Sequence, residues 1–335
     1  MSTLSFSRKV PSLFAAAMLA GCGGSQPPIG PPGTMPQSHV AATHADRSGS
    51  WIAQDAKGRD LLYVSNGEYI GKVFVYTYPS GKKIGTLASM DGARGLCVDK
   101  AGDVFVTFDA FEGGTYEFAH GGQSPIAYLG YYYGSGEANA CSIDPATGAL
   151  AVIGSYDSAF VTVYHHKPKR GWRIGRSYQV SGMASGSFCG YDDRGNLFCD
   201  GTTSSGEFVL AELPSQSKTF ANITVNESIK APGQVQWDGT HLAIGDTGIS
   251  PSKIYQFSVS GSTATEVGST TLKGSKTAEQ FWIQGARVIV SDESRSSSQS
   301  KDGGVAFYRY PAGGSATKTL TLQGAFGATI SLALH

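Results

Sequence analysis

The sequence predicts an all-β fold, and three of its features support this. Glycine is abundant, with 45 residues among 335, whereas charged side chains make up only 16% of the chain, a composition that disfavours long helices. Short alternating stretches rich in Val, Tyr and Thr recur between polar turns, as expected for strands. The apolar fraction of 40% is too high for a disordered chain, because it is enough to build a core.

The charges of the chain balance. Lys and Arg together number 26, and Asp and Glu together also number 26. The chain therefore lacks the basic field that would hold the phosphate backbone of a nucleic acid. The sequence disfavours DNA or RNA as a partner.

Residues 1–21 are predicted to be a signal peptide rather than part of the fold. Arg8 and Lys9 precede an apolar stretch that is shorter than the roughly 20 residues needed to span a bilayer. The segment Leu19–Cys22 follows and resembles the lipobox of bacterial lipoproteins, in which the cysteine carries acyl chains such as palmitate and the preceding residues are removed. The alternative is an ordinary secretory signal with a chance cysteine.

The resemblance implies a chain anchored to a membrane of the bacterial cell envelope. Several acyl chains on Cys22 would hold it there firmly. Gly23 follows, where an aspartate often retains lipoproteins at the inner membrane, so we expect the outer membrane, with the folded part in the periplasm or beyond. Residues 22–50 are rich in Pro and Gly and are expected to form a tether. The membrane is one expected partner, and a monomer is expected.

A unit of about 46 residues repeats along the rest of the chain. Residues 95–106 read as a short strand, a polar turn and an alternating strand, and this pattern recurs along the sequence. The turn positions are Asp99, Asp144, Asp192, Asp238 and Gln284, spaced by 45, 48, 46 and 46 residues. A third and a fourth strand complete the unit, as in Phe208–Leu213 and Pro125–Leu129. Four strands in a unit of this length predict a propeller blade.

The strand pattern predicts a closed ring of six blades. There are six sets of second, third and fourth strands but seven candidates for the inner strand. Because Gly324–Ile330 resembles Gly92–Val98, we expect Ala328–Leu334 to supply the inner strand of the blade that starts at Leu61 and so to remove the free sheet edges. Trp51–Asp55 remains an alternative for that place.

Taken together, the units resemble six-bladed β-propellers of the NHL-repeat type and, more closely, bacterial lipoproteins predicted to carry such a propeller. The resemblance covers residues 60–335, and we expect the propeller domain to span residues 51–335. It is specific for architecture but weak for function, because this fold hosts hydrolases, lyases and binding modules.

Four cysteines remain besides Cys22, and an exported compartment permits disulfides. Cys189 and Cys199 flank a predicted turn and could face each other across a hairpin. Cys97 and Cys141 hold similar places on neighbouring inner strands. The alternative is that all four are small buried residues.

In a propeller, the loops between the second and third strands and those joining successive blades emerge on one face, here called the loop face. That face is the default binding site. We expect it to be acidic and aromatic, because it would collect Asn66, Glu68, Tyr69, Asp109, Phe111, Glu112, Tyr131, Tyr132, Tyr133, Glu137, Asn139, Asp157, Asp200, Asp246 and Asp292.

Two interpretations apply to these loop-face residues. Asn66, Asp246 and Asp292 each follow the same strand of their blades, where such side chains commonly bond their own turn backbone. The tyrosines at 131–133 lie between glycines and cannot all point inward, so their rings could stack on a sugar or a peptide. We therefore predict a binding site at Asp109, Tyr131, Tyr132, Tyr133, Glu137 and Asn139.

The sequence favours a binding module over an enzyme. It contains no Gly-x-Ser-x-Gly, phosphate-loop or His-Glu-x-x-His motif. The first hypothesis is a binding or scaffolding propeller for glycan or protein that needs no cofactor. The alternative is a metal-dependent hydrolase resembling gluconolactonase-like propellers. That resemblance implies calcium held by oxygen ligands, which would be Glu137, Asn139, Asp246 and Asp292.

Overall fold

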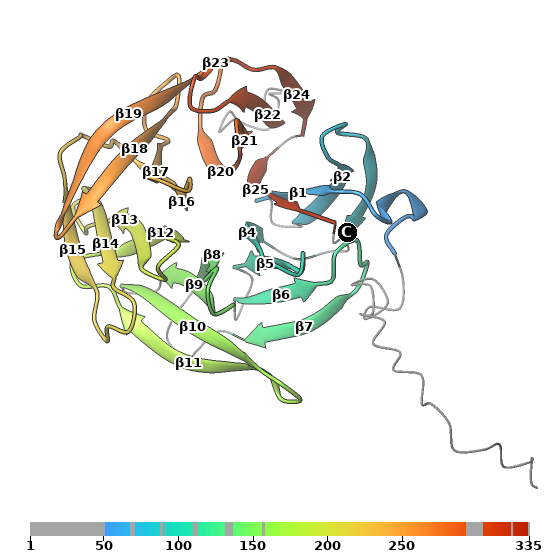
Figure 1. The fold of residues 1–335 in the computed structure, drawn as a ribbon, viewed down its shortest axis with the longest axis horizontal. Helices are drawn as coiled ribbons and strands as arrows, with labels where there is room; N and C mark the ends of the chain where they lie inside the picture. Colours follow the sequence, from blue (N-terminus) through green and yellow to red (C-terminus); the bar gives the residue numbers. More distant parts are fainter. Residues whose placement is uncertain are drawn as a thin grey trace, which may run out of the picture. The chain divides into compact units, whose positions relative to one another are not determined.

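The computed structural model describes residues 51–67, 71–87, 90, 92–109, 113–130, 137–155, 158–292, 304–322 and 324–333. Within these residues the chain is a six-bladed β-propeller of four-stranded antiparallel blades, which confirms the predicted fold class (Figure 1). The predicted signal peptide, Cys22 and the tether lie outside the described residues.

The blades are numbered from the inner strand outwards. Blade 1 is β25 (Ala325–Ser331), β1 (Leu61–Asn66), β2 (Lys72–Thr77) and β3 (Lys83–Leu87). Blade 2 is β4 (Ala93–Val98), β5 (Val104–Phe108), β6 (Gly114–Phe118) and β7 (Pro125–Gly130). Blade 3 is β8 (Glu137–Ile143), β9 (Leu150–Ser155), β10 (Ala159–Lys167) and β11 (Gly171–Gln179).

The second half of the ring has the same order. Blade 4 is β12 (Ser185–Tyr191), β13 (Leu197–Thr202), β14 (Phe208–Leu213) and β15 (Ala221–Val225). Blade 5 is β16 (Pro232–Trp237), β17 (Leu242–Asp246), β18 (Lys253–Ser260) and β19 (Thr263–Lys273). Blade 6 is β20 (Ala278–Gln284), β21 (Arg287–Asp292), β22 (Gly304–Arg309) and β24 (Lys318–Thr321), with the short β23 (Gly314–Ser315) beside β19.

The C-terminal strand closes the ring. β25 pairs antiparallel with β1, with Leu61 opposite Ser331, and it lies between the inner strands of blades 2 and 6. The strand begins three residues before the predicted Ala328, at Ala325. A closed ring leaves no inner strand edge open to another chain.

The segment around Trp51 has a different role from the alternative considered above. It forms a 3-10 turn at Gln54–Ala56 and an isolated bridge between Trp51 and Gly122. The indole ring of Trp51 packs against Gly121, where an added Cβ would lie 2.5 Å from the ring, and that glycine has a φ of +67–68° region that favours glycine. The segment therefore covers blade 2 from outside.

A buried histidine ties the closing strand to blade 2 and to the N-terminal turn. The Nδ1 atom of His120 lies 2.5 Å from the hydroxyl of Ser331, and its Nε2 atom lies 3.0 Å from the carbonyl oxygen of Arg59. The hydroxyl of Ser331 also donates to the carbonyl of Gly102 at 2.6 Å. Closure is thus held by polar contacts as well as by the β25–β1 ladder.

The core lies between neighbouring blades. The second strand of each blade is buried on both faces, as in β1 and β5, which explains their continuous runs of apolar residues. One such layer joins Leu62 and Ile330 of blade 1 to Ile289 of blade 6. Another joins Phe105 of blade 2 to Leu150 of blade 3.

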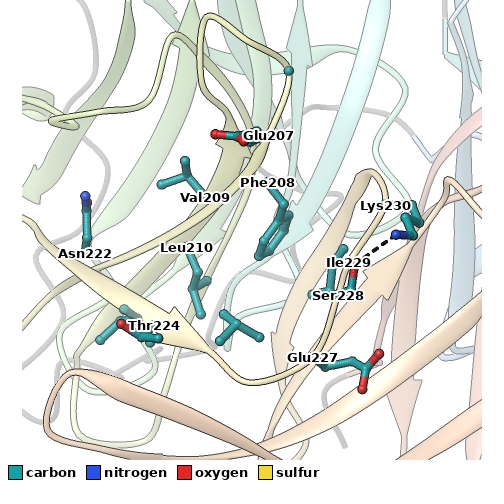
Figure 2. Close-up of a pocket in the computed structure, with 13 residues that line it drawn as sticks. Glu207, Phe208, Val209, Leu210, Asn222, Thr224, Glu227, Ser228, Ile229 and Lys230 are labelled. Carbon is teal, nitrogen blue, oxygen red and sulfur yellow. Dashed lines mark hydrogen bonds between the residues drawn. The ribbon is translucent and has the colours of Figure 1, made fainter.

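Blades 4 and 5 are also joined at their outer edges. After three pairs with β14, strand β15 turns away and pairs in parallel with β19 through Thr224 and Val225. This departure opens a cavity of about 550 Å³ on the outer flank (Figure 2). Its floor is apolar and includes Leu210 and Ile223, while Lys230 on its rim donates to Ser228 at 3.0 Å.

Candidate functional site

A β-bulge near the start of every inner strand shapes the mouth of the central channel on the loop face. The register between inner and second strands shifts at Arg94–Gly95, Asn139, Ser187–Phe188, Gly233–Gln234, Glu279–Gln280 and Phe326. A bulge re-aims the side chains that it carries. The residues at this end of the channel therefore come from positions where the strand alternation fails.

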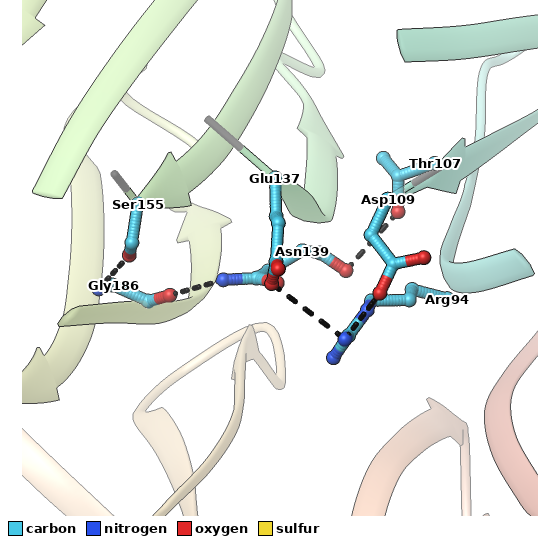
Figure 3. A network of polar contacts seen from close by, with 7 residues as sticks. All are labelled: Arg94, Thr107, Asp109, Glu137, Asn139, Ser155 and Gly186. Atoms are coloured by element: carbon cyan, nitrogen blue, oxygen red, sulfur yellow. Dashed lines mark hydrogen bonds and ion pairs between the residues drawn. The ribbon is translucent and has the colours of Figure 1, made fainter. Parts of the chain in front are cut away.

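An arginine with two carboxylates forms the centre of this mouth (Figure 3). The Nε atom of Arg94 donates to Asp109 Oδ2 at 2.7 Å, and its terminal nitrogen contacts the same oxygen. That nitrogen also lies 3.7 Å from Glu137 Oε2. Asp109 follows β5 directly, and Glu137 begins β8, so the network joins blades 2 and 3.

Glycine makes room for this network. Gly92 has a φ of +69°, and a Cβ atom there would collide with the carboxylate of Asp109. The backbone N–H of Asp109 also donates to the carbonyl of Gly92 at 3.2 Å. The turn before β4 therefore fixes where the carboxylate meets Arg94.

Two phenylalanines lie beneath the arginine. The guanidinium carbon of Arg94 is 5.6 Å from the ring centre of Phe326, within the range of a cation–π contact. Phe326 in turn stacks on Phe188 with ring centres 6.3 Å apart and an angle of 25° between planes. Because these rings belong to blades 1 and 4, which face each other across the ring, they close the channel below the charged network.

Asn139 braces the mouth between blades 3 and 4. Its side-chain nitrogen donates to the carbonyl of Gly186 at 2.8 Å, and its backbone carbonyl accepts from the hydroxyl of Thr107 at 3.0 Å. The N–H of Gly186 donates to Ser155 at 2.8 Å (Figure 3). Asn139 thereby holds the bulge of β8 in register with both neighbouring blades.

The chemistry of the mouth favours neutral or cationic groups. One guanidinium meets two carboxylates, so the charge of the cluster is net negative. The side chain of Glu137 is 59% exposed and keeps accepting capacity, whereas Arg94 is already paired with Asp109. The site can therefore accept hydrogen bonds from a ligand and offers an incoming anion little.

Of the residues predicted to bind ligand, the structure brings Asp109, Glu137 and Asn139 together around Arg94. Tyr131, Tyr132 and Tyr133 lie outside the described residues, and so do four further residues of the predicted loop face. Those four are Glu68, Tyr69, Phe111 and Glu112, and Asp157 is likewise not described.

Sequence reasoning missed Arg94, Phe188 and Phe326. A signal for two of them was present, because Gly92–Val98 resembles Gly324–Ile330 and places Arg94 and Phe326 at the same position of the repeat. Each is a large side chain followed by glycine, at a point that interrupts the alternation. Phe188 is found only through its stacking partner in the opposite blade.

The ligand set of the hydrolase alternative is not assembled, which corrects that hypothesis. The carboxylate of Asp246 is buried and accepts the N–H groups of Lys230, Ala231 and Gly248, while that of Asp292 accepts those of Lys276 and Thr277. Both acids cap their own turns. Across the part of the chain that the structure describes, no three His, Cys, Asp or Glu residues are grouped so as to hold a metal ion.

Asp200 is also placed differently from expectation. It lies within β13, fully buried, instead of on the loop face. Its carboxyl accepts the N–H of Phe188 at 2.9 Å and so supports the bulge that carries this ring. Burial raises the pKa of Asp200 well above its usual range, against the lowering effect of the N–H groups of Phe188 and Gly233.

Two disulfides join the inner part of the propeller. Cys189 and Cys199 are bonded across the hairpin of β12 and β13, with an S–S distance of 2.03 Å. Cys97 and Cys141 are bonded between β4 and β8, with an S–S distance of 2.07 Å, and so fasten blade 2 to blade 3. Throughout the described ranges, no helix is both long and apolar enough to cross a membrane.

Comparison with solved structures shows the fold. The chain matches one chain of a crystal structure of a nidogen–laminin complex with a TM-score of 0.60 and 14% identity, over 82% of this chain and 99% of the other. It also matches a functionally unknown protein from Desulfotomaculum acetoxidans with a TM-score of 0.56 and 11% identity, over 82% and 89% of the two chains. No protein-family model and no curated protein sequence matches the chain. The class of protein defined here is a six-bladed β-propeller with a charged cluster at its channel mouth.

Proposed function

We propose that this chain is a binding module of the bacterial cell envelope, held to a membrane by lipid on Cys22, that presents its loop face to a glycan or protein. The observation that carries the proposal is the cluster of Arg94, Asp109 and Glu137 at the channel mouth. It is partly exposed, rigidly supported and not used by the fold elsewhere.

The support beneath the cluster is what distinguishes it from an ordinary surface ion pair. Exposed ion pairs are worth little and hold no fixed geometry. Here the arginine is stacked on Phe326, and its carboxylate partner is placed by the turn at Gly92. A binding site benefits from such preorganisation, because less entropy is lost when the ligand arrives.

The fold comparison is compatible with a protein partner. A chain of similar architecture occurs in a complex between nidogen and laminin. Low sequence identity carries the fold alone, so the partner of this chain has to be argued from its own loop face. An acidic, aromatic surface suits an uncharged or basic partner segment.

The anchor and its location rest on the sequence. The segment Leu19–Cys22 supports lipidation, and Gly23 supports the outer membrane over the inner one. A lipid anchor and a tether of residues 22–50 would let the loop face reach partners at some distance from the membrane.

A glycan and peptide array probed with the purified full-length protein tests the proposal. We expect binding that is reduced by Glu137→Gln and by Arg94→Gln, and that is removed by alanine at Tyr131, Tyr132 and Tyr133 together. Arg287→Gln is the matched control, because this exposed arginine begins β21 at the opposite face. If the parent binds nothing on the array, or if all variants bind as the parent does, the loop face is not the binding surface.

A further inference from the structure

The central channel has a second opening, on the face opposite the loop face. A cavity of about 230 Å³, here called the lower funnel, lies among the last residues of the inner strands of blades 2 to 6. Its lining includes Tyr191, Gln234, Trp237 and Trp282. No residue of the charged cluster at the channel mouth belongs to it.

The lower funnel is separated from the loop face by side chains that fill the channel. β4 carries Arg94 near its start and ends at Val98, which lines the funnel. Between them, the side-chain nitrogen of Gln280 donates to the carbonyl of Leu96 at 2.8 Å, and its oxygen accepts the N–H groups of Leu96 and Ala328, both at 3.1 Å. This amide crosses from blade 6 to blades 1 and 2. The two ends of the channel are therefore distinct sites.

Two polar atoms of the funnel residues are left without partners among the described residues. Gln234 is only 7% exposed, and its side-chain oxygen accepts no hydrogen bond. The buried indole N–H of Trp237 has no acceptor. Neighbouring groups are satisfied, since Gln236 makes two bonds with Ile283. Buried polar groups in native proteins are nearly always paired, so an acceptor and a donor side by side indicate a bound molecule.

The lining selects among ligand classes. Among the described residues that line the funnel there is no Lys, Arg or His, so an anion finds no partner. The carboxylate of Asp192 is occupied by the N–H groups of Arg194 and Asn196 and by the side chain of Asn196, which leaves little for a cation. A hydroxyl both donates and accepts, and thus suits Gln234 and Trp237 together.

The aromatic side chains complete this preference. Tyr191, Trp237 and Trp282 provide rings against which the apolar face of a sugar can pack. A volume of about 230 Å³ is below the range of roughly 300–1,000 Å³ found for drug-sized ligands, and therefore fits a single ring. We propose that the lower funnel binds one residue of a neutral carbohydrate, independently of the loop face.

Tryptophan fluorescence of the purified full-length protein provides the test. Of the four tryptophans in the chain, Trp237 and Trp282 line the funnel. The protein is titrated in turn with D-glucose, D-galactose, D-mannose and N-acetyl-D-glucosamine. We expect a saturable change with at least one of them. Trp237→Phe keeps an aromatic ring but removes the N–H, and should weaken that binding by about five- to tenfold, as for one lost hydrogen bond.

Two further variants complete the design. Gln234→Met keeps the length of the side chain without its carbonyl oxygen and should weaken binding to a similar degree. Trp172→Phe is the matched control, because Trp172 lies between blades 2 and 3 and donates to Glu117. It should leave the affinity unchanged, as should Arg94→Gln, which separates this site from the loop face.

Three outcomes would overturn the proposal. The first is the absence of a saturable change with all four sugars. The second is equal affinity of the parent and both funnel variants, with melting confirmed to be cooperative. The third is a crystal of the protein soaked in these sugars in which only ordered water fills the funnel.

Discussion

Replacing Ile330 by alanine tests how the ring is closed. This side chain lies in β25 and is 1% exposed, packed in the layer that contains Leu62 and Ile289. If β25 is the inner strand of blade 1, the substitution leaves a cavity between blades 1 and 6. Removing a buried isoleucine side chain down to alanine costs about 2–5 kcal/mol of the free energy of unfolding. That is a large part of the roughly 5–15 kcal/mol that stabilises a typical domain.

Leu332 supplies the matched control, because it lies two residues further along and is 43% exposed. Leu332→Ala removes a similar apolar volume from the surface and should change stability by no more than about 0.5 kcal/mol. Both variants and the parent are unfolded in urea and followed by tryptophan fluorescence. The slopes of the transitions should agree, so that the midpoints report stability.

The reasoning fails if the two substitutions cost the same. In that case the side chain at 330 would be exposed in solution and β25 would not close the ring. A transition that splits into two steps for Ile330→Ala alone would instead show that blade 1 opens before the rest, which still requires β25 as the closing strand.

The remaining predictions concern acid titration, the disulfides and the anchor. Burial raises the pKa of Glu117 to about 6 from its ordinary 4.5, although Trp172 donates to it; the folded chain thus holds this proton more tightly, and the free energy of unfolding should fall by about 2 kcal/mol as pH rises through this window, a slope that Glu117→Gln removes in urea titrations at several pH values. Paired serine substitutions should cost about 4 kcal/mol at Cys97–Cys141 and about 3 kcal/mol at Cys189–Cys199, because the closed loops differ in length, with separations of 44 and 10 residues; equal midpoints in non-reducing urea would contradict this. Cys22→Ser should abolish membrane attachment, and a processed variant that still sediments with membranes would refute lipidation.

The strands were predictable because their signals are local. Phe208–Leu213 was expected and is β14 without any shift, and Pro125–Leu129 differs from β7 by one residue. Alternation and turn residues act over a few positions, so they are visible in a single repeat. Closure could also be anticipated, since the likeness of Gly324–Ile330 to Gly92–Val98 shows that the last segment has the pattern of an inner strand.

The site was predictable only in part. Asp109, Glu137 and Asn139 were found because they stand at strand ends on one face, which the repeat alone indicates. Arg94 and Phe326 were missed because they sit in bulges, where one extra residue turns a side chain out of the alternation. Asp200 was misplaced for a similar reason, since only the bulge of β12 gives a buried carboxyl a backbone N–H to bind.

The sequence by itself determined the all-β class, the repeat, the number of blades and the C-terminal closing segment, because each depends on patterns within about one unit. Tertiary structure decided what meets at the axis. Phe188 and Phe326 are 138 positions apart in the chain, and Gln280 bonds Leu96 across a separation of 184 residues. Such pairs form only when the ring closes and brings six inner strands around one channel, so their chemistry is set by the assembled blades and not by any local pattern.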